Sequence, residues 1–318
     1  MAQDEFAIIR QYFSAIGNPG PDIVLGVGDD AAVVEVPAGF QQVVSLDTLI
    51  ADVHFPADTS PAEVAYKSLA VNVSDLAAMA ATPSWFLLSI SLPRVDPSWL
   101  EQFSAGLKQA AEQFGLALIG GDTCRGALSI SLQIAGLVPA GEFVTRGGAK
   151  PGDLVLVSGT LGNAALGLAF SQGRIDLPET LRSRCMEALN RPRPRLELAP
   201  FLREYATAAI DISDGLRGDL GHILEASHCG ACIDRSLLPV DPWIGQQDLY
   251  AYALGGGDDY EICCTLPAER RGRVDDWNRQ HADCPLTIIG EITESAFTLV
   301  ADGEIVDLST AGGFRHFG

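Results

Sequence analysis

Seven aspartates recur in short clusters flanked by glycine or serine along this chain of 318 residues. Carboxylates gathered in this way repel one another and are costly to bury unless a cation joins them. A ligand set made of oxygen atoms alone favours a hard divalent ion, and Mg²⁺ with a phosphate group in its shell fits best. The residues are Asp29, Asp30, Asp47, Asp75, Asp122, Asp211 and Asp214.

Asp75 is the most telling of these carboxylates. It lies in the segment 69–80, which predicts a helix that is apolar almost all round and therefore buried. Asn72 precedes it by three residues, so the two side chains share one helix face. A buried carboxylate needs a partner, which is either a salt bridge or a metal ion, and we favour the metal.

Three glycine-rich acidic segments could bring carboxylates close to a phosphate. The segment 26–32 lacks the third glycine of a dinucleotide fingerprint and carries two acids, so either a metal site or a plain acidic turn is expected. In Gly120-Gly121-Asp122 the acid is expected just past a strand end, where backbone N–H groups can approach a phosphate. The segment 210–216 repeats this pattern, with helix capping by Ser213 or Asp214 as the alternative.

A first block of strands and helices would position the earlier acids. Ser60, Pro61 and Glu63 form a capping box and predict a helix that runs to about residue 81. Hydrophobic periodicity predicts a further helix over 97–114. Strands are expected at 42–49, 85–92, 116–119 and 129–138.

A composition break at 139–142 separates this block from a second one, and we place the domain boundary near residue 140. The second block predicts a helical stretch over 177–205, interrupted near Pro192 and Pro194. Its strands are expected at 154–157, 231–234, 261–266, 287–292 and 297–300. The fold class is therefore mixed α/β in two domains, 1–140 and 141–318.

Composition narrows the possible partners. A net charge of −20 argues against nucleic acid, and only Lys67, Lys108 and Lys150 represent lysine, so arginine and metal are expected to recognise phosphate. No apolar stretch reaches the roughly 18 residues of a membrane span, and the N-terminus lacks a secretory signal, which favours a cytoplasmic protein. The seven cysteines are irregularly spaced and receive no function. No lysine-containing phosphate loop is present.

The order and spacing of these motifs resemble the thiamine-monophosphate kinase family of the aminoimidazole ribonucleotide synthetase superfamily. The matching segments are Glu5-Phe6, Tyr12-Phe13, 28–30, 47–49, His54-Phe55, Tyr66-Lys67, 75–79, 120–123, Arg146, 148–153, 211–216, 219–222, 256–261 and 313–317. They extend over essentially the whole chain.

The resemblance implies a two-domain α/β protein that forms a homodimer through its N-terminal sheets and binds ATP in a cleft between the domains. It implies Mg²⁺-assisted transfer of the ATP γ-phosphoryl group onto thiamine monophosphate, which gives thiamine diphosphate (EC 2.7.4.16). No protein nucleophile is needed, because the acceptor is itself an ionised phosphate. The N-terminal domain would bind ATP and Mg²⁺, and the C-terminal domain would complete the ATP and substrate sites.

The resemblance also assigns residues. It implies metal ligands at Asp30, Ser45, Leu46 (through its backbone), Asp47, Asp75, Asp122, Asp211 and Asp214. It implies ATP contacts at Gly121, Asp122, Arg146 and Ser213. It implies contacts to thiamine monophosphate at His54, Asp258 and Phe314.

A few positions depart from the family pattern. Asp258 stands where relatives usually carry glutamate, and Cys124 and Gly147 replace a threonine and a serine. Selenophosphate synthetases and hydrogenase-maturation proteins share the superfamily, but they rely on an N-terminal or C-terminal cysteine that this chain lacks. A non-catalytic nucleotide-binding regulator is the remaining alternative, and binding alone would not need so many carboxylates.

Overall fold

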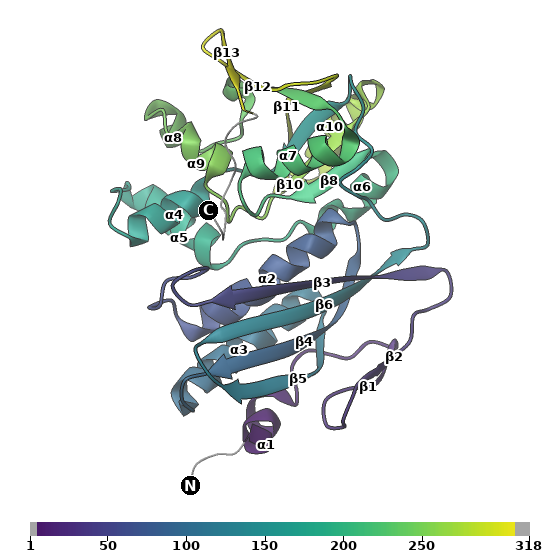
Figure 1. Ribbon diagram of the computed structural model, residues 1–318, viewed down its shortest axis with the longest axis vertical. Coiled ribbons are helices and arrows are strands. Elements are labelled where there is room, and N and C mark those ends of the chain that lie inside the picture. Colours follow the sequence, from purple (N-terminus) through teal and green to yellow (C-terminus); the bar gives the residue numbers. More distant parts are fainter. Residues whose placement is uncertain (1–4, 309–318) are drawn as a thin grey trace. The chain divides into compact units, whose positions relative to one another are not determined.

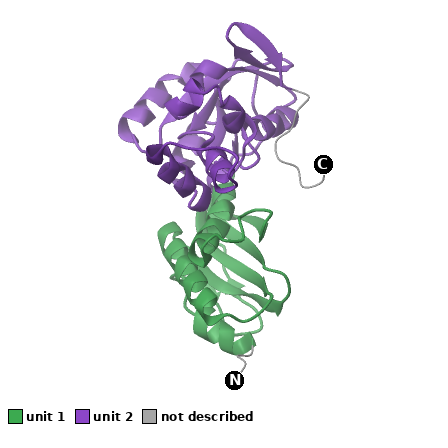
Figure 2. Ribbon diagram, turned by 90° about the vertical axis from the view of Figure 1, so that its left-hand side faces the viewer, with its two compact units in different colours: residues 1–76, 81–142 green, residues 77–80, 143–318 purple. Residues whose placement is uncertain are grey.

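The computed structural model describes residues 5–308, and they divide into two compact units (Figure 2). Unit 1 comprises residues 1–76 and 81–142, and unit 2 comprises 77–80 and 143–318. Among the described residues no helix is both long and apolar enough to cross a membrane. Each unit has its own sheet and its own core.

Unit 1 is built on a four-stranded sheet in the order β3-β6-β4-β5 (Figure 1). Two long helices, α2 and α3, cover one face of this sheet. The elements are α1 (Glu5–Ile8), a π-helical turn (Ile9–Phe13), β1 (Ile23–Leu25), β2 (Val33–Val34), β3 (Phe40–Ile50), α2 (Pro61–Ala78), β4 (Thr82–Leu92), α3 (Pro97–Phe114), β5 (Ala117–Arg125) and β6 (Ser129–Pro139).

The two long helices begin where the sequence predicts. Ser60 Oγ accepts from the Glu63 N–H at 3.3 Å, which confirms the serine half of the predicted capping box, and it donates to Glu63 Oε2 at 2.7 Å. The carboxylate of Asp96 accepts from the N–H groups of Ser98 and Trp99 at the start of α3. Gly115 ends α3 in the left-handed region at φ 71°. The predicted helix over 97–114 is confirmed.

The opposite face of the unit 1 sheet is only partly covered. The β1–β2 hairpin contributes Ile23, Ala32 and Val34 to a small cluster with Trp85 and Ile119. Several apolar side chains of β3 and of the hairpin stay exposed, up to 60% for Leu46. They are Val24, Leu25, Val33, Val36, Phe40, Val44, Leu46 and Ile50. We call this set the exposed apolar face.

Unit 2 is built on a seven-stranded mixed sheet in the order β13-β12-β9-β11-β7-β10-β8. Its elements are β7 (Leu154–Ser158), α4 (Asn163–Ser171), α5 (Glu179–Asn190), η2 (Leu196–Leu198), α6 (Ala199–Tyr205), β8 (Ala208–Asp211), α7 (Leu216–Ser227), β9 (Gly230–Asp234), η3 (Arg235–Leu237), α8 (Pro242–Gln246), α9 (Tyr250–Gly255), β10 (Ile262–Leu266), η4 (Ala268–Arg270), α10 (Gly272–Gln280), β11 (Leu286–Thr293), β12 (Phe297–Ala301) and β13 (Glu304–Asp307).

Helices bury both faces of this second sheet. The core on one face includes residues of α7 and the thiol of Cys263, whereas the core on the other includes residues of α6 and α10 and the thiol of Cys264. Adjacent residues of a strand point to opposite faces, so each of the two cysteines packs in a different core. All seven cysteines are free thiols.

Candidate functional site

The most closely coupled of the expected ligands are Asp47 on β3 and Asp75 on α2. Ser45, two residues before Asp47 and on the same face of the strand, donates its Oγ hydrogen to Asp75 Oδ2 at 2.5 Å. Asn72, one turn before Asp75, accepts the Asp47 N–H on its Oδ1 at 3.1 Å. α2 therefore docks on β3 through polar groups in the midst of an apolar helix face.

The electrostatics of this pair favour a cation. Desolvation, followed by the neighbouring charge of Asp75, raises the pKa of Asp47 to about 6. Two part-buried carboxylates and a hydroxyl oxygen make a hard-oxygen donor set of the kind that Mg²⁺ prefers. The residues present at this position therefore fit the metal that the sequence predicts.

Asp30 and Asp122 belong to a different part of unit 1. Both line a cleft of about 900 Å³ beside the β1–β2 hairpin and the edge strand β5. Asp29 accepts the N–H of Asp30 at 2.8 Å, so its carboxylate shapes the hairpin turn. Gly120 and Gly121 line the same cleft, together with Phe6, Phe13 and Trp85.

Asp47 and Asp122 lie on the two opposite edge strands of the sheet, β3 and β5. Asp47 is in register with Leu132, Leu88 and Gly121, whereas Asp122 is in register with Ser89, Ser131 and Thr48 one row away. Neighbouring rows point to opposite faces, and three strand spacings of roughly 4.8 Å separate β3 from β5 by about 14 Å. Across residues 5–308 no three His, Cys, Asp or Glu side chains gather closely enough to hold a metal. One copy of unit 1 does not bring all four carboxylates together.

The expected position of Asp122 past a strand end is wrong. β5 continues through Gly120, Gly121 and Asp122 as far as Arg125, paired in parallel with β4. A Cβ on Gly121 would lie 1.8 Å from the Leu88 carbonyl oxygen. The glycine is therefore required for the close approach of the two strands.

In unit 2, Asp211 ends β8, and Ser213 and Asp214 follow in the loop before α7. The capping alternative for Ser213 or Asp214 is not what forms: Gly215 is the N-cap of α7 and no side chain caps it from that position. Instead the buried carboxylate of Asp219, in the first turn of α7, accepts the Asp214 N–H at 3.0 Å. Burial raises the pKa of Asp219 to about 7, although the backbone N–H groups of Asp214, Gly215 and Ser213 oppose the shift.

The loop that carries Asp258 is hydrogen-bonded to this same segment. The N–H of Asp258 donates to the Ser213 carbonyl at 2.8 Å, and the N–H of Tyr260 donates to the Ile212 carbonyl at 2.8 Å. The hydroxyl of Tyr260 donates to Asp258 Oδ1 at 3.1 Å. Two acidic segments about 45 residues apart in the sequence are thus joined by backbone hydrogen bonds. The hydrophobic periodicity of the sequence does not reveal this pairing.

Two further acids, Asp259 and the buried Glu261, anchor the Asp258 loop. The carboxylate of Asp259 accepts the Gly162 N–H at 2.9 Å at the start of α4, and enclosure of that carboxylate raises its pKa well above the usual value. Glu261 pairs with the buried Arg195 at 2.6 Å and accepts from Ser158 Oγ at 2.5 Å. Sequence reasoning assigned these two acids no anchoring role, and the available signal was their place in the acidic segment 256–261 together with Asp258.

The remaining expected site residues are scattered. His54 accepts the Ile50 N–H on Nδ1 at 3.0 Å, which leaves the proton of a neutral ring on Nε2. Arg146 is exposed in unit 2, and Leu46 is 60% exposed on β3 with its backbone paired to β6. Phe314 lies outside the described residues.

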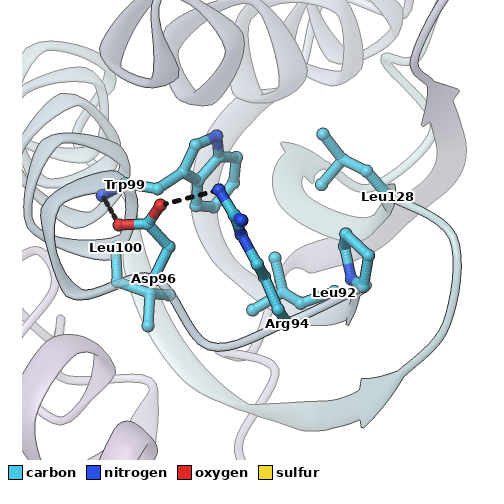
Figure 3. Close-up of a pocket in the computed structure, with 7 residues that line it drawn as sticks. Leu92, Arg94, Asp96, Trp99, Leu100 and Leu128 are labelled. Carbon is cyan, nitrogen blue, oxygen red and sulfur yellow. Dashed lines mark hydrogen bonds and ion pairs between the residues drawn. The ribbon is translucent and has the colours of Figure 1, made fainter.

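Two further cavities in unit 1 lie near β4. The smaller, of about 180 Å³, is lined by apolar side chains with Arg94 and Asp96 paired at 3.5 Å across it (Figure 3). The larger, of about 710 Å³, shares Arg94 with the first and shares Asp122 with the cleft beside β5. Asp122 therefore stands between two cavities.

Two family models match the chain. The AIR synthase related protein, N-terminal domain, matches residues 28–138, and the AIR synthase related protein, C-terminal domain, matches residues 150–302. Together they account for well over half of the sequence.

Individual relatives agree with these models. Thiamine-monophosphate kinase of Escherichia coli (strain K12) is 44% identical over 324 residues, which covers 100% of this chain and 99% of the relative. The crystal structure of thiamine-monophosphate kinase from Stenotrophomonas maltophilia K279a is 43% identical, covers 89% of this chain and 92% of that chain, and superposes with a TM-score of 0.82. The structure of AaThiL complexed with AMPPCP and TMP is 32% identical, covers 92% of both chains and has a TM-score of 0.77.

Proposed function

Because the chain belongs to the thiamine-monophosphate kinase family of AIR synthase-related proteins, we propose that it transfers the γ-phosphoryl group of ATP in line to thiamine monophosphate with the help of Mg²⁺. Its activity is the ATP-dependent phosphorylation of thiamine monophosphate to thiamine diphosphate (EC 2.7.4.16).

The observation that carries the metal assignment is the Asp47–Asp75 pair. Its like charges lie in a part-buried position where desolvation already raises the pKa of Asp47 to about 6. Bound Mg²⁺ would offset both these charges and the charges of the two phosphate groups that must meet. Ser45 and the backbone of Leu46 extend the same donor set along β3, and Asp30, Asp122, Asp211 and Asp214 are the further proposed ligands.

The chain needs to supply little besides position and charge balance. Thiamine monophosphate carries an ionised phosphate near neutral pH, so no strong base has to activate it. The free thiols in the two cores of unit 2 are buried, and burial raises the pKa of Cys264 to about 12, which disfavours a thiolate nucleophile. We infer direct transfer, because an ionised acceptor phosphate needs no covalent enzyme intermediate.

The proposed substrate contacts follow the motifs. We assign the nucleotide to Gly121, Asp122, Arg146 and Ser213, and thiamine monophosphate to His54, Asp258 and Phe314. The cleft of about 900 Å³ that includes Gly121 and Asp122 has apolar walls of Phe6, Phe13 and Trp85, which suits a ligand with both a ring and a charged tail. Unit 1 would bind ATP and Mg²⁺, and unit 2 would add ATP and substrate contacts in a cytoplasmic enzyme.

The division of unit 1 ligands between two sheet edges supports a homodimer. The exposed apolar face is the kind of surface that a second copy covers. A two-fold partner on that face can set the Asp30 and Asp122 edge of one copy beside the Asp47 and Asp75 edge of the other. We therefore propose that each metal centre takes carboxylates from both copies.

Mixed dimers test this arrangement. Asp75→Asn and Asp122→Asn are each expected to abolish transfer while keeping the fold. If the two residues act from different copies, co-refolding the variants restores about one quarter of wild-type activity, because half of the dimers are mixed and each has one intact site. A matched mixture of Asp75→Asn with Asp47→Asn stays inactive. No recovery in the first mixture would place all the ligands within one copy.

Phosphorus NMR with ATP, Mg²⁺ and thiamine monophosphate tests the reaction itself. The expected result is growth of the thiamine diphosphate and ADP signals in equal amounts, with no free phosphate. Consumption of ATP without thiamine diphosphate would overturn the function, and full activity of Asp75→Asn at limiting Mg²⁺ would overturn the metal assignment.

A further inference from the structure

The loop between β8 and α7 has an unusual internal partner. The N–H of Asp214 donates to Asp219 Oδ2 at 3.0 Å. The neighbouring backbone N–H groups of Ser213 and Gly215 also act to lower the pKa of the Asp219 carboxyl. Asp219 is only 2% exposed. Such a run of N–H groups at a helix N-terminus is a ready-made anion site, and here the chain fills it with its own carboxylate.

The opposite side of the loop is held as well. The carbonyl groups of Ile212 and Ser213 accept the N–H groups of Tyr260 and Asp258, each at 2.8 Å. Gly215 has a φ of 106°, and a Cβ there would lie 2.7 Å from Gly255. The Asp214 donor and the Ile212 and Ser213 acceptors of the loop are therefore occupied by protein groups.

This arrangement decides what the loop can offer to a ligand. Because the Asp214 N–H donates to Asp219, that donor is not available to a phosphate at the start of α7. The side chains that remain for a ligand are those of Asp211, Ser213 and Asp214. The two carboxylates suit a cation, and the serine hydroxyl can donate a hydrogen bond to a ligand oxygen. The carboxylate of Asp219, in the first turn of α7, offsets the partial positive charge at the N-terminus of this helix.

We propose that Asp219 is a positioning residue that occupies the anion site of α7 and thereby holds Asp211, Ser213 and Asp214 in place for the metal–nucleotide complex. This inference rests on the proposed function for the identity of that complex. Residues that orient metal ligands typically change metal affinity or activity by about 10- to 100-fold when they are removed.

Asp219→Asn and Asp219→Ala test the proposal against Asp241→Asn. Asp241 is a matched control, because its buried carboxylate also accepts a backbone N–H in unit 2, that of Trp243 at 3.0 Å, away from the loop. We expect kcat for thiamine diphosphate formation to fall at least tenfold in Asp219→Ala and less in Asp219→Asn, which keeps one acceptor oxygen. The Mg²⁺ concentration for half-maximal rate should rise, while KM for thiamine monophosphate and the melting temperature of Asp219→Asn stay close to wild type.

Calorimetric titration with Mg²⁺ and AMPPCP gives a readout that does not depend on turnover. Weaker binding of the metal–nucleotide complex by both Asp219 variants, with unchanged binding by Asp241→Asn, supports the positioning role even if the wild type proved not to phosphorylate thiamine monophosphate. Equal binding in wild type and variants, or no binding in either, overturns it. A loss of activity that merely follows a loss of melting temperature would also overturn it.

Discussion

The carboxylates of Asp47 and Asp75 lie in a part-buried position that is electrostatically unfavourable without a cation. Burial and the charge of Asp75 raise the pKa of Asp47 to about 6, while hydrogen bonds from Ser45 to Asp75 and from the Asp47 N–H to Asn72 hold the pair in place. A fold that retains such a pair without a cation gives up stability for it. This loss of unfolding free energy can be measured as a function of pH.

Asp47→Asn is expected to stabilise the metal-free protein in a pH-dependent way. The native pKa of Asp47, about 6, exceeds the ordinary value of 3.8, so the native state binds the proton more tightly than the unfolded chain. Its contribution to stability is therefore complete below pH 4 and is lost as pH rises through 6. The asparagine variant should gain about 1–2 kcal/mol over wild type at pH 7.5, after allowance for partial solvent screening, and almost nothing at pH 4.

Thermal unfolding in EDTA between pH 4 and 8 measures this difference. The exposed Asp58→Asn serves as the control and should follow wild type at every pH. Adding Mg²⁺ should raise the melting temperature of wild type more than that of Asp47→Asn. A variant advantage that stays constant from pH 4 to pH 8 would contradict the prediction.

Asp258 offers a test of the substrate pocket at the same scale. Its carboxylate is held by Tyr260 and by backbone pairing to Ser213. If it contacts thiamine monophosphate, Asp258→Asn removes a charge opposite the cationic thiazolium ring and should raise KM for that substrate about tenfold, a loss of about 1.4 kcal/mol. KM for ATP should not change.

Steady-state kinetics with each substrate varied in turn provide the measurement. Asp248→Asn is a suitable comparison, because Asp248 is exposed in the same unit and pairs with Arg235 at 3.2 Å. An equal rise of KM for both substrates would argue against a specific contact.

At the scale of elements, the sequence predicted well wherever a local signal exists. The capping box of α2 and the period and caps of α3 depend on residues close together in the chain, and both helices begin as expected. The prediction ended β5 too early, because glycines normally break strands, whereas here the neighbouring β4 requires them. The β1–β2 hairpin and β13 escaped prediction, because their short strands depend on packing rather than on pattern.

Gly121→Ala tests the requirement of β5 for glycine. A Cβ at this position would lie 1.8 Å from the carbonyl oxygen of Leu88, so the edge of the sheet must move and Asp122 with it. We expect a loss of about 3 kcal/mol or more in unfolding free energy, and of activity even where the variant still folds.

Denaturant unfolding of Gly121→Ala beside Gly39→Ala separates crowding from backbone strain. Gly39 has a φ of 84° and open space around its Cβ position, so its variant should lose only about 1–2 kcal/mol. Similar losses in the two variants would show that the contact with Leu88 is easily relieved.

For the whole molecule, the exposed apolar face and the divided carboxylates point to association. If the proposed homodimer forms through that face, where Val44 is 50% exposed, the charge added by Val44→Lys should shift it toward monomer and reduce phosphoryl transfer in parallel. Ile305→Lys is the matched control, because Ile305 is a 74% exposed apolar residue on β13 of unit 2.

Sedimentation velocity and activity, measured on the same samples, test this prediction. Val44→Lys should regain activity at high protein concentration as dimers reform, whereas Ile305→Lys should behave as wild type throughout. A fully active monomer would contradict the sharing of metal ligands between copies.

The sequence by itself predicted the chemistry that we propose for this protein, a set of oxygen ligands for a cation and no nucleophile, and it predicted mixed α/β elements in two blocks. These properties can be predicted from the sequence because they depend on residue type, on spacing and on local signals. Only the tertiary structure decided which carboxylates meet, because strand order separates Asp47 and Asp75 from Asp30 and Asp122. Only the tertiary structure, likewise, turned Asp219 back onto the loop before α7, since long-range pairing and burial choose partners that spacing does not reveal.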